Sequence, residues 1–124
     1  MSDAPLGLHF LLDVSEAPFE TLDDPVLLEQ ALLLAVREMG ANVLGAHIHR
    51  LAPQGVSGVV VISESHLTIH TWPERGEAAI DLFTCGDPVR ARRAVAGLAA
   101  RLGAGRTRVT EMTRGMSSKP VPRT

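Results

Sequence analysis

The sequence has no tyrosine, one cysteine, one lysine and no long apolar run, and each scarcity excludes a class of protein. No stretch reaches the roughly 18 apolar residues that span a bilayer, so we expect no membrane segment. With 3 % aromatic residues and a formal net charge of −2, the chain lacks the stacking surface and the basic charge typical of nucleic-acid binding.

The cysteine and lysine content indicates a compartment and restricts the cofactor. The single cysteine, Cys85, cannot form an intrachain disulfide, and no basic export segment is visible at the start, so we expect a reducing cytoplasm. The one lysine, Lys119, lies in a polar, proline-containing stretch near the C-terminus. Because pyridoxal phosphate needs a lysine inside the site, carbonyl-based chemistry on amines would require a carbonyl that the protein makes itself.

Apolar periodicity predicts six strands and two helices in one small domain. The expected strands are 6–14, 42–51, 56–63, 65–72, 77–83 and 106–112, of which the last should have one wet face. Each helix, 26–39 and 89–102, follows an Asp-Pro start signal and ends at a glycine. The order β-α-β-β-β-β-α-β predicts an α+β two-layer sandwich, a mainly antiparallel sheet with two helices on one face.

The densest polar stretch is 63–74, and Cys85 lies one strand further on. A buried polar group without a partner costs about 1–3 kcal/mol, so this stretch indicates a functional site. It lacks the G-x-S-x-G motif of serine hydrolases. A thiol nucleophile made of Cys85 and His70 is one alternative, and a histidine metal site is another, although no CxxC or HExxH motif is present and we expect no metal. The candidate metal pairs are His47 with His49 and His66 with His70.

Two motifs in this region resemble a known family. VSGVVVISESHLTIHTWPE, residues 56–74, and AAIDLFTCGD, residues 78–87, are similar to the S-adenosylmethionine decarboxylase proenzymes of bacteria and archaea, and the resemblance runs from about Leu6 to about Gly115. It implies a self-processing, pyruvoyl-dependent carboxy-lyase. The product would be the decarboxylated aminopropyl donor for spermidine and other polyamines.

By this resemblance, the chain cuts itself between Glu64 and Ser65, and Ser65 becomes a covalent pyruvoyl group that forms a Schiff base with the substrate amine. His70 corresponds to the histidine that removes the Ser65 α-proton, Ser57 to the serine that assists processing, and Cys85 to the cysteine that returns a proton to the substrate. Residues five apart on a regular strand point to opposite faces. We therefore expect either that Ser65 lies just before the regular strand that carries His70 or that a bulge intervenes, and we favour the first.

The resemblance also implies a substrate pocket, where the chain departs from the family. Trp72 and Glu74 match family residues, and Glu74 is the acid expected to bind the ribose hydroxyls. Leu51 stands where the family commonly has phenylalanine, and Arg75 and Glu77 stand where it tends to have tyrosine. Aromatic faces favour a purine and a sulfonium. Their loss leaves an alternative, a pyruvoyl-dependent L-arginine or L-ornithine decarboxylase derived from the same family.

We expect one decarboxylase domain over 1–115, cut into a β chain (1–64) and an α chain (65–124), with a disordered tail over 116–124. A chain of this length buries only about two-thirds of its unfolded surface, which favours a homodimer of cleaved protomers. The expected partner is otherwise a small-molecule substrate, with no nucleic acid and no membrane. The competing class is a non-catalytic, uncleaved relative that regulates a partner subunit.

Overall fold

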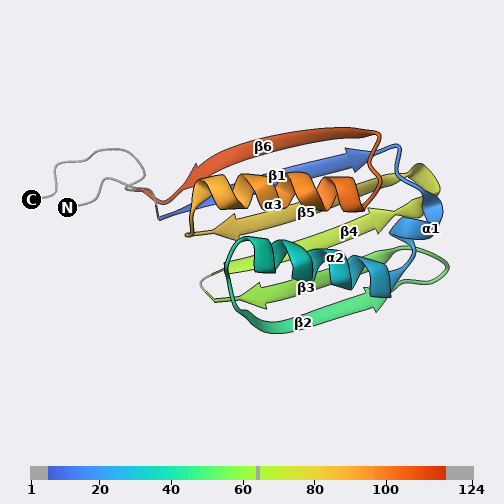
Figure 1. The fold of residues 1–124 in the computed structure, drawn as a ribbon. Coiled ribbons are helices and arrows are strands. Elements are labelled where there is room, and N and C mark those ends of the chain that lie inside the picture. The colour runs from blue at the N-terminus through green and yellow to red at the C-terminus, as the bar shows by residue number, and fades with distance from the viewer. Residues whose placement is uncertain (1–5, 64, 117–124) are drawn as a thin grey trace, which may run out of the picture.

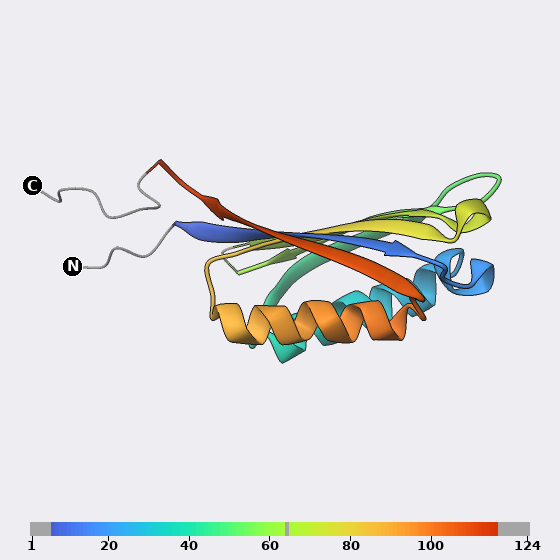
Figure 2. The ribbon, with the colours of Figure 1, turned by 90° about the horizontal axis from the view of Figure 1, so that it is seen from above.

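The computed structural model describes residues 6–63 and 65–116. A single six-stranded sheet, in the order β2-β3-β4-β5-β1-β6, carries two long helices on one face (Figure 1, Figure 2). Every neighbouring pair of strands is antiparallel. The predicted α+β two-layer fold is therefore confirmed.

The strands are β1 (Gly7–Ser15), β2 (Val43–Arg50), β3 (Val56–Ile62), β4 (Ser65–Trp72), β5 (Glu77–Thr84) and β6 (Arg106–Arg114). The long helices, α2 (Pro25–Glu38) and α3 (Pro88–Arg101), lie within one residue of their predicted bounds. Two short elements were not predicted, α1 (Phe19–Leu22) and the 3-10 helix η1 (Pro73–Arg75). Each is about one turn long, too short to produce an apolar period.

Both long helices begin at the predicted Asp-Pro signals. The Asp24 carboxylate accepts the backbone N–H groups of Val26 and Leu27, at 3.0 and 3.1 Å. The Asp87 carboxylate accepts the Val89 N–H at 2.9 Å. These caps satisfy N–H groups that have no partner within the helix, so the sequence determines where each helix starts.

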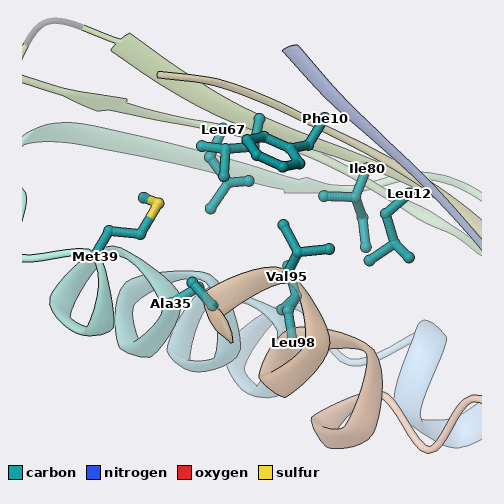
Figure 3. Close-up of a pocket in the computed structure, with 10 residues that line it drawn as sticks. Phe10, Leu12, Ala35, Met39, Leu67, Ile80, Val95 and Leu98 are labelled. Carbon is teal, nitrogen blue, oxygen red and sulfur yellow. The ribbon is translucent and has the colours of Figure 1, made fainter. Parts of the chain in front are cut away.

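The core lies between the sheet and the helices. Figure 3 shows sheet side chains facing helix side chains across this layer: Phe10, Leu12, Leu67 and Ile80 against Ala35, Met39, Val95 and Leu98. The void among them is about 10 Å³, no larger than one water molecule requires. This layer is a packed core, and a substrate must bind elsewhere.

The face of the sheet opposite the helices, the open face, is covered by no other element of the described chain (Figure 2). In β4, Leu67, Ile69 and Thr71 are buried against the helix layer, so the residues between them point to the open face. The same alternation in the other strands directs all five histidines there. They are His9, His47, His49, His66 and His70.

The edge strand β6 departs from the prediction. All nine of its residues are exposed, including Val109, which faces the helix side. The prediction that only one face of β6 is exposed was therefore wrong, because an edge strand that the helices do not fully cover is exposed on both sides. Among the described helices, none is long and apolar enough to cross a membrane. Glu64 and residues 117–124, which hold most of the predicted tail, lie outside the described residues.

Candidate active site

Ser65 is the first residue of β4 and follows a tight turn from β3. The β3–β4 pairing runs without a shift from Ser57 opposite His70 to Ile62 opposite Ser65. The expectation that Ser65 precedes the strand is therefore wrong, and the regular alternation points Ser65 and His70 to opposite faces. The Ser65 hydroxyl is buried and has no hydrogen-bond partner among the residues that the structure describes.

Cys85 lies directly after β5, close to the turn that precedes Ser65. It lines a pocket of about 240 Å³ together with Ser63 from that turn and with Thr84. The Thr84 hydroxyl oxygen accepts the Gly86 N–H at 3.0 Å, which holds the loop around Cys85. Cys85 is an exposed residue, so it lies where a molecule bound in this pocket would contact it.

Ser57 and His70 face each other across β3 and β4 on the open face. Ser57 Oγ and His70 Nδ1 are 3.1 Å apart, within hydrogen-bond distance. His49 of β2 pairs directly with Ser57, so the three residues form a row across three strands. A hydroxyl bonded to one ring nitrogen orients the imidazole and determines which nitrogen can take up a proton.

Two of the predicted substrate-binding residues meet beyond His70. Trp72 at the end of β4 pairs with Glu77 at the start of β5. Both line a pocket of about 350 Å³ on the open face, which also includes Asp13 and Arg108. Trp72 is 44 % exposed, so much of its indole is available for contact with a ligand.

The other two substrate-binding candidates lie on neighbouring turns. Glu74 is an exposed residue of η1, and Leu51 is an exposed residue that follows β2. Arg75 and Glu77 are the two residues that replace the family's tyrosines. Their side chains form an ion pair, with Arg75 Nε 3.7 Å from Glu77 Oε2. This ion pair is largely exposed, so it is weak, but it places a cation beside the Glu77 carboxylate.

The candidate residues therefore form two groups at opposite ends of the sheet. The Ser65 group is Ser65 and Cys85, and the His70 group is Ser57, His70, Trp72, Glu74, Leu51 and Glu77. Figure 1 shows the β3–β4 turn and the end of β5 at one end and η1 at the other. Five residues of extended strand place His70 about 17 Å from Ser65. A base must lie within hydrogen-bond reach of the proton that it removes, so His70 cannot act on Ser65 of the same chain.

The alternative site chemistries are not supported by this geometry. Cys85 and His70 lie in different groups, so the structure does not bring together the thiol and imidazole of a cysteine nucleophile. The His47 and His49 rings stack with centroids 6.0 Å apart. Among the described residues, no three His, Cys, Asp or Glu side chains are grouped as metal ligands.

Sequence reasoning missed two buried threonines beside these groups. Thr71 donates to the Leu22 carbonyl at 2.7 Å and accepts the Val56 N–H at 2.8 Å, which ties the end of α1 to β3 and β4. Thr84 lies at the other end of the sheet. Both occupy inward positions of strands whose other inward residues, apart from Ser65, are Leu, Ile or Ala. The inward phase of β4 and β5 was the signal that could have found them.

Asp23, also missed, holds the turn that carries Leu51. Its carboxylate accepts hydrogen bonds from the Arg50 guanidinium at 2.7 Å and from the Gly55 N–H at 2.9 Å. These two bonds, Arg50 first, lower the pKa of Asp23 below its ordinary value of 3.8. Leu51 N–H also donates to the Gly55 carbonyl at 2.7 Å. The turn is thus fixed next to the His70 group.

Comparison with known proteins identifies the family. Residues 8–115 match the family model described as S-adenosylmethionine decarboxylase. The chain belongs to this family. The S-adenosylmethionine decarboxylase proenzyme of Caldanaerobacter subterraneus subsp. tengcongensis is 49 % identical over 116 residues, covering 94 % of each chain. That of Thermotoga maritima is 52 % identical over 110 residues, covering 89 % of this chain and 85 % of the relative.

A solved structure agrees with this assignment to the S-adenosylmethionine decarboxylase family. The crystal structure of the adenosylmethionine decarboxylase from Aquifex aeolicus matches with a TM-score of 0.86 at 32 % identity, covering 98 % of this chain and 97 % of that one. The predicted family is confirmed. The names of these proteins support S-adenosylmethionine decarboxylation over the arginine or ornithine alternative.

Proposed function

We propose that this chain is a self-processing, pyruvoyl-dependent S-adenosylmethionine decarboxylase that works as a homodimer. The observation that carries the proposal is the Ser65 hydroxyl, which is buried at the start of β4 without a hydrogen-bond partner among the residues that the structure describes. An unsatisfied buried hydroxyl costs about 1–3 kcal/mol, and such groups persist where chemistry uses them. In a chain of this family, that chemistry is the cut between Glu64 and Ser65.

The cut is proposed to proceed through an ester. Ser65 Oγ attacks the carbonyl carbon of Glu64, the C–N bond breaks, and the Ser65 nitrogen becomes a free amine. A base then removes the Ser65 α-proton, the Cβ–Oγ bond breaks, and Glu64 leaves as a carboxylate. Water replaces the nitrogen of the resulting dehydroalanine, and ammonia is released. Fragments 1–64 and 65–124 remain, the second beginning with a ketone.

The residues around Ser65 fit the group that the cut would leave. It would stay attached through the backbone to His66, beside the pocket that Cys85 lines. When present, the pyruvoyl carbonyl supplies the electron sink for loss of carbon dioxide from an α-amino acid. Cys85 Sγ is proposed to give a proton to the carbon that carbon dioxide leaves. Because an oxidised cysteine has no such proton, we propose the reducing cytoplasm as the working compartment.

The His70 group is proposed to bind the nucleoside part of the substrate. The exposed Trp72 indole can stack on a purine, Glu74 can accept hydrogen bonds from ribose hydroxyls, and Leu51 supplies an apolar contact. Glu77 lies 3.7 Å from Arg75. The Arg75 guanidinium partly offsets the negative charge of the Glu77 carboxylate. Glu77 therefore attracts the basic side chain of a bound arginine or ornithine less strongly, and the arrangement favours S-adenosylmethionine.

The homodimer follows from the separation of the two groups. Consider two copies with their open faces in contact, related by a twofold axis perpendicular to the strands. This arrangement reverses the strand direction and puts the His70 group of one copy over the open side of the strand end that carries Ser65 in the other. Exposed apolar side chains of the open face, Val61, Trp72 and Met112, would be covered. Each dimer would then hold two complete sites.

Freshly purified protein tests the proposed cut. Denaturing gels and mass spectrometry should find fragments 1–64 and 65–124, with a carbonyl in place of the amine at the start of the second. Borohydride added with substrate should attach the substrate covalently to fragment 65–124. Active material with an intact chain and an unaltered Ser65 would contradict the proposal and would leave the non-catalytic regulator as the better explanation.

A substrate panel tests the specificity. Carbon dioxide release should be compared for S-adenosylmethionine, L-arginine and L-ornithine at equal concentrations. We expect release from S-adenosylmethionine alone. Release from either basic amino acid at a similar or higher rate would show that the loss of aromatic residues around Leu51 and Glu77 had changed the substrate.

A further inference from the structure

Thr84 has hydrogen-bonding capacity that the described chain does not use. It is one of two buried polar residues in the described parts of the chain, the other being Thr71. The Thr71 hydroxyl both donates, to the Leu22 carbonyl, and accepts, from the Val56 N–H. The Thr84 hydroxyl only accepts, from the Gly86 N–H at 3.0 Å. Because a hydroxyl has one proton and two lone pairs, Thr84 keeps a proton and a lone pair for another partner.

Ser65 lies beside Thr84 on the same side of the sheet. Leu67 pairs with Leu82, and two residues further along both strands Ser65 reaches the level of Thr84. Leu67 and Leu82 are buried against the helices, so the alternation points Ser65 and Thr84 to that side too. Directly opposed side chains of antiparallel strands have Cβ atoms about 4.5–5.5 Å apart. Two hydroxyls at this separation are within reach of one hydrogen bond.

The two hydroxyls complement each other, because Ser65 Oγ is buried without a partner in the described parts of the chain and Thr84 has an unused lone pair. We propose that Thr84 is a positioning residue for self-cleavage. For the attack, the Ser65 hydroxyl, which makes no hydrogen bond among the described residues, turns to donate one to Thr84 Oγ1, and this bond holds the hydroxyl in a single orientation. This inference rests on the proposed function, since it requires that the Glu64–Ser65 bond is the one cut. In the attack, the Ser65 proton ends on the released amine, and Thr84 is unchanged.

The same oxygen accepts the Gly86 N–H, so a single side chain would hold both the nucleophile and the loop that carries Cys85. Valine has the shape of threonine without the hydroxyl, whereas serine keeps the hydroxyl without the methyl group. Comparing the two substitutions at position 84 therefore separates the hydrogen bond from the packing of a buried strand end.

The test is a time course of proenzyme cleavage after cell-free synthesis, followed on denaturing gels. Thr84→Val should slow cleavage about tenfold or more, as expected from losing about 1.4 kcal/mol of transition-state stabilisation. Thr84→Ser should stay within about threefold of the wild type. Thr113→Val is the matched control. Leu8 pairs with Thr84 on one side and Thr113 on the other, so Thr113 lies in the same row, about 14 Å from Ser65, and its substitution should not change the rate.

Hydroxylamine identifies the step that is slowed, because it cleaves esters under conditions that leave amides intact. Uncleaved Thr84→Val chains should resist hydroxylamine, since the ester does not form. Uncleaved His70→Ala chains should be cut by it, since their ester forms and persists. Far-UV circular dichroism should show that each variant is folded.

Three outcomes would overturn the inference. They are cleavage of Thr84→Val at the wild-type rate, equally slow cleavage of Thr84→Val and Thr84→Ser, and accumulation in Thr84→Val chains of an ester that hydroxylamine cuts. Each of these leaves the proposed function standing, because the wild type is still cleaved. A wild-type chain that never cleaves would overturn the proposed function, and this inference with it.

Discussion

The two ends of β4 differ in how fully their polar side chains are satisfied. At the His70 end, Ser57 and His70 are 3.1 Å apart, and the buried Thr71 hydroxyl makes two strong hydrogen bonds. At the other end, Ser65 Oγ is buried with no partner in the described chain, and Thr84 makes one bond. This difference fits the proposed roles, in which the His70 end binds the substrate and accepts a proton and the Ser65 end carries the group that reacts.

The separation of these ends is the reason why the proposed chemistry needs two protomers. A base and the proton that it removes must be within hydrogen-bond reach, whereas about 17 Å of strand lies between Ser65 and His70. A twofold-related copy resolves this, because a reversed strand direction brings unlike ends together. The site would then be assembled from two chains, and each chain would supply the half that its partner lacks.

The largest effect is expected from Ser65→Ala. Alanine has no hydroxyl to attack Glu64, so no ester, no fragments and no ketone should form. Mass spectrometry should find one intact chain after prolonged incubation, and carbon dioxide release should fall to background. Ser57→Ala is the comparison from the His70 end, where Ser57 of β3 pairs with His70 of β4. It should still cleave, more slowly, because it removes a group that orients the base rather than the nucleophile. Fragments from Ser65→Ala would place the cut elsewhere.

Mixed dimers test whether the two ends belong to different chains of one site. Neither Ser65→Ala nor His70→Ala should cleave alone. When the two are unfolded together and refolded as an equal mixture, random pairing puts about half of the His70→Ala chains with a Ser65→Ala partner, whose intact His70 should restore their cleavage. Mass spectrometry distinguishes the two chains. If the mixture stays uncleaved although the heterodimer forms, the base is not supplied by the second copy.

Cys85→Ala should have an intermediate effect that falls on turnover. Cleavage should proceed, because the thiol is not used in it, while decarboxylation should slow about 10²-fold, a typical loss for a positioned proton donor. The same pairing experiment sharpens the comparison. Cys85→Ala refolded with His70→Ala should regain turnover at one site of each heterodimer, because Cys85 and Ser65 lie in the same group. If turnover does not recover, Cys85 and His70 of one chain must act at the same site, which would contradict the grouping of Cys85 with Ser65.

The strands and helices were predictable because their signals are local. Alternation across β4 and β5 reports the buried face, and the Asp24 and Asp87 carboxylates mark the helix starts. The exposure of β6 was not predictable in this way. Its alternation is that of a half-buried strand, but whether a helix covers the inner face depends on where α3 lies over the sheet. Whether a strand lies at the edge of a sheet is decided by tertiary structure and cannot be predicted from a local stretch of sequence.

The members of the candidate site remain predictions from sequence motifs, and their arrangement could not be predicted from the sequence. Five residues separate Ser65 from His70 in the sequence, yet a strand keeps them about 17 Å apart. Thirteen residues separate Ser57 from His70, yet the hairpin brings their side chains to 3.1 Å. Separation along the sequence therefore did not predict which side chains lie close together, whereas strand register does. The alternation of β5 marks Thr84 as an inward residue, but its position beside Ser65 is known only from the strand register.

The smallest effect is expected at the His70 end, from Asp23→Asn. The hydrogen bond from Arg50 and the N–H of Gly55 lower the pKa of Asp23 in the folded chain, so the ionised carboxylate favours folding. That contribution is complete well above pH 3.8, the ordinary pKa, and is lost as the pH falls through the lowered folded pKa. Asparagine cannot ionise, so the wild type should have the higher Tm at neutral pH, by no more than a few degrees.

Thermal unfolding followed by circular dichroism from pH 7 to pH 2 checks this, and the Tm difference should shrink below about pH 4 as the wild-type carboxyl takes up its proton. Arg50→Gln should reproduce much of the neutral-pH loss, because it removes the principal partner of the carboxylate. A Tm difference that did not change with pH would mean that Asp23 acts through shape alone. Since this carboxylate holds the turn that carries Leu51, the variant should also raise KM for S-adenosylmethionine while the cleavage rate at the Ser65 end stays unchanged.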